Sequence, residues 1–445
     1  MKIKVLVVIA LIAFSFSGVS QKKWELREAV DYAVKNNISI KQNALTLDLF
    51  KEDVVGAKGN FLPNLNGSSG SNLNFGSTID PVSNGRVSAT SFSSSYSLRS
   101  GITIFNGFRL VNSYKSAQLN VLSGKLDLQE IVDNVSLNVV NSYLNILFAK
   151  ENLAVANVQL EISKRQIEVT QNQVDAGTKA KGELLNSKST YASDLQAVVS
   201  LENTLNLALL QMAQLLQLDP TNFDVATIDV GDPTTALLFK DPTTIYNKAV
   251  DTRPEILKEK IGIKNSELGI EIAKSGFLPT LTASVSAGTN YFHQFKLIFP
   301  GQENDYFFKQ LNDNFGYGVG VSLSIPIFNR YQNKVNVNKA TIRKEQSELS
   351  LESAKLSLQQ TIQRAFLDAK AALKSYEAAK SSLEAQQEAF KNAQERHNYG
   401  AMTLFDFDLV RNRLVNAEST LIRSKYDYVF KSKVLKFYYG ESIFD

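Results

Sequence analysis

The sequence lacks the residues on which most enzyme and metal sites depend. It contains no cysteine and only two histidines among 445 residues, which excludes disulfide bonds, thiolate ligands and cysteine nucleophiles. His293 and His397 share no spacing typical of zinc binding, and we interpret both as packing or surface residues. Neither a phosphate-binding loop nor a nucleophile elbow is present. We therefore expect no catalytic residue, no metal and no cofactor, and a hydrolytic enzyme is the least favoured function.

The sequence also has little excess of either charge and few long hydrophobic runs. The formal net charge is +4, and two of those charges belong to Lys2 and Lys4 at the start of the chain. So nearly neutral a chain gives no electrostatic reason to bind nucleic acid. Beyond residue 20, no apolar run approaches the roughly 20 residues of a membrane helix. If the protein lies in a membrane, strands must cross it.

Residues 1–20 are predicted to be a secretory signal peptide. Lys2 and Lys4 supply a basic start, residues 5–14 are apolar, and Gly18-Val19-Ser20 provides small residues before the expected cleavage point. The alternative is an N-terminal membrane anchor, but the apolar stretch is short for a span. Gln21 follows where a lipoprotein would have cysteine, so no acylation site is expected.

The chain does contain a very long segment without helix breakers, residues 330–399. This segment has neither Gly nor Pro and is rich in Ala, Leu, Glu, Gln, Lys and Ser, so it predicts one continuous helix. At about 1.5 Å per residue, such a helix would be roughly 105 Å long. Large side chains recur at every seventh position from Tyr376 to His397, a spacing typical of coiled-coil packing.

The long segment occurs twice because the chain carries an internal duplication. Phe105-Asn106 before the first copy matches Phe328-Asn329 before the second, and Gly177 then aligns with Gly400. Residues 110–176 are therefore expected to form a second long helix, with one internal glycine. A duplication of this size governs the fold.

The duplication also sets the expected domain organisation. A further motif, Phe61-Leu62-Pro63 in the first copy and Phe277-Leu278-Pro279 in the second, precedes the predicted strands. Prolines mark a connecting segment between the copies, with a candidate short strand at 225–230. The predicted divisions are a first repeat at 21–218 (strands about 64–105, helical hairpin about 110–217), a connecting segment at 219–242, and a second repeat at 243–445 (strands about 280–327, helical hairpin about 330–438).

Apolar and small polar residues alternate in the segments predicted to be strands. This period of two extends over residues 96–104 in the first copy and over 281–287 and 317–325 in the second. An apolar face opposite a small polar face is typical of membrane-crossing strands of about 9–11 residues, although a soluble sandwich shows the same alternation. Loops are expected at 75–95 and 290–315, and the second loop is rich in aromatic residues that suit a membrane interface.

Two strands from each copy give four strands per chain, and four strands cannot close a barrel. An open sheet edge cannot lie in lipid, and known small barrels begin at about eight strands. A membrane sheet of this kind must therefore be shared between chains. Three chains with four strands each would supply twelve.

Together these features resemble the TolC family of outer-membrane efflux channels. The resemblance rests on the order of duplicated motifs: Ala-Lys-x-x-Phe-Leu-Pro before the strands, Ile-Phe-Asn after them, and Ala-Gly or Tyr-Gly where the long helices end. The run Thr252-Arg253-Pro254-Glu255-Ile256 resembles the start of the family's second repeat. The resemblance covers essentially the whole mature chain.

The resemblance implies an α+β membrane protein. Its fold class would be a trimeric twelve-stranded β-barrel, with four strands per chain, continued by a long α-helical coiled-coil-like barrel and built from two internal repeats. The implied location is the outer membrane of a Gram-negative cell, with a large periplasmic portion. The implied function is an export duct of a tripartite efflux or type I secretion system. Its partners would be a homotrimer of this chain, a periplasmic adaptor protein, an inner-membrane transporter and outer-membrane lipid, but no nucleic acid.

A second class of function stays open at this point, namely a periplasmic or secreted coiled-coil scaffold without a pore. Single-channel conductance would separate the two alternatives. The sequence identifies neither the transported substrate nor the class of pump.

The resemblance also indicates functional positions where the long helices end. Glu183, Asp406 and Asp408 are the expected carboxylates of the periplasmic aperture, where threefold symmetry would gather them into rings that favour cations. For each carboxylate the alternative role is helix capping. The residues expected to dock the adaptor are Ala176, Gly177, Thr178, Tyr399, Gly400, Ala401 and Met402. Both glycines are expected to take the left-handed conformation that ends a helix.

The sequence departs from the family at the latch of this aperture. Better-studied members close it partly with Tyr and Arg side chains, and His397 and Met402 stand at those positions here. We therefore do not expect this chain to close its aperture with the family's Tyr and Arg latch. Another contact must keep the tips closed against repulsion between the aperture carboxylates, and packing around Phe405 and Phe407 is the candidate.

Overall fold

The computed structural model describes residues 23–79, 84–228, 239–295 and 304–442. The predicted signal peptide lies outside the described residues, as do residues 229–230 of the candidate short strand. The chain folds into two compact units. The helical unit comprises the described residues within Met1–Leu45, Leu126–Lys258 and Leu351–Asp445, and the sheet unit comprises those within Thr46–Lys125 and Glu259–Ser350. Each unit therefore draws segments from both halves of the chain.

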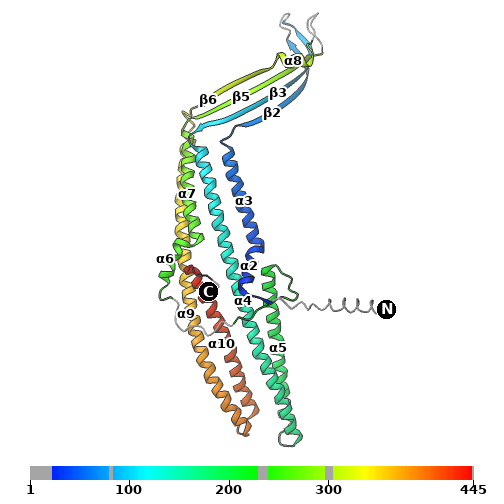
Figure 1. Ribbon diagram of the computed structural model, residues 1–445, viewed down its shortest axis with the longest axis vertical. Helices are drawn as coiled ribbons and strands as arrows, with labels where there is room; N and C mark the ends of the chain where they lie inside the picture. The colour runs from blue at the N-terminus through cyan, green and yellow to red at the C-terminus, as the bar shows by residue number, and fades with distance from the viewer. Residues whose placement is uncertain (1–22, 80–83, 229–238, 296–303, 443–445) are drawn as a thin grey trace, which may run out of the picture. The chain divides into compact units, whose positions relative to one another are not determined.

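The sheet unit contains one antiparallel sheet in the order β2-β3-β5-β6 (Figure 1). Its strands are β2 (Asn64–Ile79), β3 (Arg86–Asn106), β5 (Thr280–Gln294) and β6 (Gly316–Ser324). Each half of the chain supplies one hairpin, and β3 pairs with β5 to join them, for example at Ile102 and Ala283. The predicted set of four strands per chain is thus confirmed.

The strands are longer, and the loops shorter, than the sequence analysis predicts. Residues 75–79 and 86–95 continue β2 and β3, and Tyr291 and Phe292 belong to β5, so their prediction as loops is wrong. The second loop also includes a short helix, α8 (Phe307–Asp313). Runs of Ser, Gly and Asn lack the apolar alternation that identifies a strand. The backbone ladder continues through them because it does not depend on the side chains.

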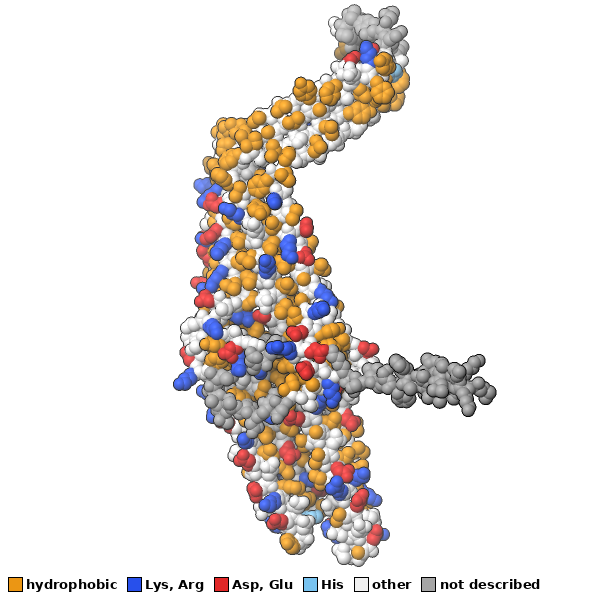
Figure 2. Space-filling model, viewed as in Figure 1, with side chains coloured by type: hydrophobic (Ala, Val, Ile, Leu, Met, Phe, Trp, Pro, Cys, Tyr) orange, Lys and Arg blue, Asp and Glu red, His pale blue; other side chains and the backbone are white. Residues whose placement is uncertain are grey.

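The register between strands gathers apolar residues on one face of the sheet. Val285 pairs with Val319, and Leu281 pairs with Leu323. These pairs share a face because successive residues of a strand alternate between faces. Val319 is 76% exposed and Leu323 is 59% exposed, and Figure 2 shows hydrophobic side chains spread over the sheet. The sheet therefore presents apolar surface that the described residues of a single chain leave uncovered.

Besides α8, the sheet unit contains segments of four helices: α3 (Ile38–Gly59), α4 (Arg109–Asp175), α7 (Pro254–Lys274) and α9 (Gln332–Asn398). The bounds of α4 and α9 confirm the two long continuous helices. Helix α4 continues through Gly124, and the absence of a side chain there leaves room for Phe50 of α3. A Cβ at this position would lie only 2.8 Å from the Phe50 ring.

The helical unit is built on two helical hairpins, in which α4 is followed by α5 (Lys181–Leu216) and α9 by α10 (Leu404–Tyr439). Its shorter elements are α2 (Leu26–Asn36), α6 (Pro242–Thr252) and the parallel pair β1 (Lys23–Trp24) and β4 (Asp224–Val225). Tyr143 is fully buried in the core of this unit, and its hydroxyl donates to the Ala226 carbonyl at 2.6 Å. That bond fixes the small sheet against α4. Within the described ranges, no helix has a segment both long and apolar enough to cross a membrane.

Candidate functional site at the hairpin tips

Each long helix ends at a glycine that turns the chain into the returning helix. Gly177 has a φ of +72° and Gly400 a φ of +71°, in the left-handed region where most side chains are strained. The Ala401 amide donates to the Arg396 carbonyl at 2.8 Å, and the equivalent bond at the first tip is 2.9 Å long. Such bonds are typical of helices that end in a left-handed glycine. The conformation predicted for both glycines is confirmed.

A cavity of about 680 Å³ lies between the two tips. Lys179 and Glu183 line it from the first tip, and the second tip contributes Arg396, His397, Gly400, Ala401, Met402, Thr403, Leu404, Asp406, Leu409 and Val410. We call this cavity the tip cleft. It brings together Glu183 and Asp406 of the predicted aperture and three of the predicted docking residues. The other predicted docking residues are exposed at the helix ends, and they are Ala176, Gly177, Thr178 and Tyr399.

Asp406 lies in the first turn of α10, next to the side chain that caps this helix. Its backbone amide donates to the Thr403 hydroxyl at 3.1 Å, and that hydroxyl lies 2.7 Å from the Asp406 carboxylate. Thr403 therefore provides the side-chain cap, while the carboxylate of Asp406 remains exposed at the cleft. Glu183, in the first turn of α5, forms an ion pair with Lys179 at 3.3 Å. Glu183 therefore has a cationic partner, whereas Asp406 forms no ion pair with any described residue.

Asp408 lies between the two hairpins and does not line the cleft. Its carboxylate accepts a hydrogen bond from the Thr190 hydroxyl of α5 at 3.1 Å and lies 3.6 Å from Nε of Arg411. The Arg411 side chain is 3% exposed and also pairs with Asp194 of α5 at 3.3 Å. Burial raises the pKa of Asp408, whereas the Arg411 charge and the Thr190 hydrogen bond lower it. Asp408 thus takes part in the contact between α5 and α10.

The sequence analysis missed the residues that surround Asp408. Asp408 and Arg411 are one helical turn apart, a spacing from which their pairing can be predicted. No signal in the sequence places Thr190 beside Asp408, since 218 residues separate them. Gln159 of α4 belongs to the same cluster. With its side-chain amide assigned so that the oxygen faces Arg411, this oxygen accepts a hydrogen bond from Nε at 2.9 Å.

His397 packs inside the second tip. Its ring stacks on Phe407 with a centroid separation of 4.8 Å and an interplanar angle of 19°. Its Nε2 atom is buried and has no hydrogen-bond partner among the described residues. Burial lowers the pKa of His397 and so does nearby Lys179, whereas Glu183 and Asp408 raise it. Protonation of His397 would therefore place an unpaired positive charge within the packed tip.

The two phenylalanines considered for tip packing have different surroundings. Phe407 is buried with Leu404 and Ala393 inside its own hairpin, and Phe390 packs against this group. Phe405 is 76% exposed. Only Phe405 therefore remains accessible to a partner outside its own hairpin.

The chain was compared with known families, sequences and solved structures. Residues 29–217 and 245–441 match the family model described as outer membrane efflux protein. The chain belongs to this family. Over 440 residues it is 24% identical to outer membrane protein TolC of Escherichia coli (strain K12), a match that covers 97% of this chain and 85% of that relative.

The fold is also similar to that of solved outer-membrane channels. The Campylobacter jejuni CmeC outer membrane channel superposes with a TM-score of 0.75 at 18% identity, over 93% of this chain and 85% of that one. The open state of the Neisseria gonorrhoeae MtrE outer membrane channel gives a TM-score of 0.71 at 18% identity, over 94% and 89% of the two chains. These structures are channels, and their fold matches the predicted combination of a small sheet with long helices.

The family match confirms the predicted resemblance to TolC-type channels and the predicted fold class. The protein is an efflux channel of the outer membrane with a large periplasmic portion. The alternative of a scaffold without a pore is set aside, because the matches to channel proteins cover 93–97% of this chain.

Proposed function

We propose that three copies of this chain assemble into one duct that carries substrates across the outer membrane. The observation that carries this proposal is the four-stranded sheet with an exposed apolar face and two open edges, β2 and β6. An unpaired backbone group in lipid costs several kcal/mol, so both edges must find partners. Pairing β6 of one copy with β2 of the next, three times, would close a barrel of twelve strands.

We infer that the duct is built from the two sequence repeats of each chain. Residues 21–218 and 243–445 would each supply one strand hairpin and one helical hairpin, joined by 219–242. The four long or returning helices of each chain would line a periplasmic tunnel beneath the barrel, as the family resemblance implies. Transport in such a duct is passive, and no residue receives a catalytic role.

We propose that the tip cleft forms the periplasmic entrance. Threefold symmetry would gather three Asp406 carboxylates into a ring, with Glu183 close by and partly neutralised by Lys179. Such a ring attracts cations and repels anions. Asp408 keeps a different role in this proposal, because Arg411 and Thr190 already engage its carboxylate.

We also propose that the exposed tips bind a periplasmic adaptor, through which an inner-membrane transporter delivers substrate. The predicted docking residues are either exposed at the helix ends or line the cleft. Tyr399 is 88% exposed beside Gly400, and an exposed aromatic residue next to a rigid turn is typical of binding surfaces.

Conductance in a planar lipid bilayer tests this function. The purified protein should give discrete current steps, while a Val321→Arg variant should fail to insert because Arg on the lipid face of a barrel costs about 2–4 kcal/mol near the midplane. Ser322→Arg is the matched control, since this neighbouring residue faces the opposite side of β6 and should still conduct. Equal behaviour of the two variants, or no current from the unmodified protein, would contradict the proposal.

A further inference from the structure

Helix α8 stands at the end of the sheet opposite the ends that continue into α4, α7 and α9 (Figure 1), and the function proposed above gives it no role. Strand β6 ends its pairing with β5 at Gly288. Two side-chain amides bind the next part of this β5 edge. Asn304 donates to the Gln294 carbonyl at 2.8 Å and accepts from its amide at 3.0 Å. Gln310 of α8 binds the carbonyl and amide of Phe292 in the same way. Helix α8 is therefore fixed to β5 by bonds that imitate strand pairing.

The ring of Phe307 in α8 packs on the apolar face of the sheet. Its centroid lies 5.0 Å from that of Tyr291 in β5 and 6.4 Å from that of Tyr96 in β3. Tyr291 shares a face with Val285 because an even number of positions separates them along the strand. The Phe308 ring lies 5.3 Å from the Phe307 ring and is 75% exposed. Apolar surface thus continues without a break from the sheet onto α8.

Another side of α8 is charged. Lys309 forms ion pairs with Asp305 at 2.6 Å and with Asp313 at 4.0 Å. The three residues follow one another at intervals of four, so they share one side of the helical segment. All three are exposed. A helix with one aromatic side and one charged side is typical of helices that lie at a membrane surface.

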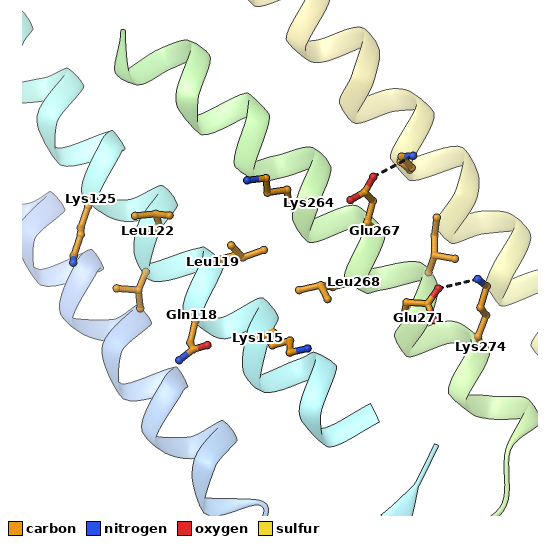
Figure 3. A pocket seen from close by; sticks show the side chains of 13 residues that line it. Lys115, Gln118, Leu119, Leu122, Lys125, Lys264, Glu267, Leu268, Glu271 and Lys274 are labelled. Atoms are coloured by element: carbon orange, nitrogen blue, oxygen red, sulfur yellow. Dashed lines mark hydrogen bonds and ion pairs between the residues drawn. The ribbon is translucent and has the colours of Figure 1, made fainter. Parts of the chain in front are cut away.

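The length of the apolar face places α8 at its outer boundary. Tyr291 follows Leu281 by ten positions in β5, which is about 34 Å along an antiparallel strand. With a strand tilt of about 40°, this length spans roughly 26 Å across a membrane, which matches the apolar band of membrane barrels. Figure 3 shows that the helices adjoining the other end of the sheet carry charged residues, such as Lys115 of α4 and the pair of Lys274 with Glu271 on α7. The band therefore runs from these helices to Tyr291 and α8.

We propose that α8 is an interfacial anchor whose aromatic side inserts among the lipids of the outer leaflet. The inference rests on the proposed function, in which the apolar face of the sheet contacts lipid. Phe308 then lies where the acyl chains meet the headgroups, the depth that aromatic side chains favour, and Lys309 faces water. Lipid is the occupant of this surface because Phe307 and Phe308 continue the lipid-contacting face. Such an anchor opposes movement of the channel along the membrane normal.

Fluorescence quenching by brominated lipids tests this placement, because Trp24 is the only tryptophan in the chain. In a Trp24→Phe background, Phe308→Trp introduces one reporter at an exposed position, where the larger ring can be accommodated. The purified protein is reconstituted in phosphatidylcholine brominated either near the headgroups or near the ends of the acyl chains. Phe308→Trp should lose more fluorescence with bromine near the headgroups. This readout of depth is the same for both orientations of the protein in a vesicle.

Two variants in the same background supply the controls. Val319→Trp lies on the apolar face and is paired with Val285, between Leu281 and Tyr291, so it should lose more fluorescence with bromine near the chain ends. Ser322→Trp faces the opposite side of β6. It should respond to neither lipid but should be quenched by iodide in the aqueous phase.

The controls also separate this inference from the function on which it rests. If iodide quenches Phe308→Trp as strongly as Ser322→Trp and neither lipid does, α8 lies in water, where a soluble partner could reach it, and the proposal is overturned. Stronger quenching of Phe308→Trp by bromine near the chain ends overturns it too. In both cases, quenching of Val319→Trp by lipid leaves the proposed function intact. If Val319→Trp also escapes both lipids, the proposed function fails together with the anchor.

Discussion

The guanidinium of Arg411 in α10 lies 3.3 Å from the carboxylate of Asp194 in α5 and joins the second helical hairpin to the first. The Arg411 side chain is 3% exposed and that of Asp194 is 16% exposed. Together with Thr190 and Asp408, these residues form a cluster that we call the hairpin clasp. A buried ion pair adds little net stability when intact, but loss of one partner is costly because the other charge stays buried. The clasp therefore fixes how the two hairpins meet near their tips.

Replacement of Arg411 by Met is expected to destabilise the protein by about 3–5 kcal/mol, since it leaves Asp194 and Asp408 without their cation. The thermal unfolding temperature should fall by several degrees. Arg413→Met is the matched control, because Arg413 lies on the same helix and is exposed. If both variants unfold at the temperature of the unmodified protein, the clasp has no structural role.

Acidification is expected to loosen the second tip through His397. Its pKa in the folded chain lies below the ordinary value of 6.5, so the folded tip binds a proton less readily than the unfolded chain does. The neutral ring therefore contributes stability that is fully present above pH 6.5 and is lost as the pH falls through the lowered pKa. Hydrogen exchange of the amides around residues 390–410 should accelerate between pH 7.5 and pH 5.5, after correction for the intrinsic pH dependence of exchange.

The chain offers a direct control for this pH effect, because His293 is its only other histidine. His397→Phe keeps an aromatic ring stacked on Phe407 and should abolish the acceleration, whereas His293→Phe should preserve it. Acceleration that persists in His397→Phe would assign the effect to another group, such as Asp408.

Gly400→Ala is expected to strain the second tip by about 1–2 kcal/mol, because the left-handed conformation brings a Cβ close to the following carbonyl oxygen. The cavity around Gly400 has room for the added methyl group, so the backbone is the reason for the cost. Gly182→Ala, at an open helical position, should be neutral. Binding of the adaptor, measured by co-purification, should fall only in Gly400→Ala, while the trimer persists in both variants.

Asp406→Asn is expected to reduce cation selectivity without loss of the helix cap, since Thr403 retains its bond to the residue 406 amide. Under a salt gradient across a planar bilayer, the reversal potential should move toward zero. Asp427→Asn, an exposed position further along α10, removes the same charge and should have no effect. An unchanged reversal potential in Asp406→Asn would show that selectivity resides elsewhere.

Much of the fold can be predicted from the sequence because its strongest signals are local or repeated. The absence of Gly and Pro over 330–399 is enough to predict α9, and the aligned positions of Gly177 and Gly400 are enough to predict both helix ends. The ends of the strands could not be predicted. Residues 75–79 and 86–95 consist largely of Ser, Gly and other small residues, and their strand structure depends on the pairing of β2 with β3, joined at residues 91–95 by pairing with β5.

The site could be predicted only in part, for a related reason. Asp406 and Glu183 follow the tip glycines at equal spacing, so the duplication indicates them. The contact of Asp408 with Thr190 depends on how one hairpin packs against the other, and no local sequence pattern predicts it.

Cysteine cross-linking between β6 and β2 tests the proposed duct most directly, because the chain has no cysteine of its own. A cysteine at Ser322 of β6 is paired with a second one at successive positions 64–72 of β2, and the protein is oxidised in its membrane. A disulfide forms only where the two α-carbons come within about 7 Å. The account predicts that some pairs yield covalent dimers and trimers and nothing larger. Monomers at every pair, or a series of products that continues beyond three chains, would contradict it.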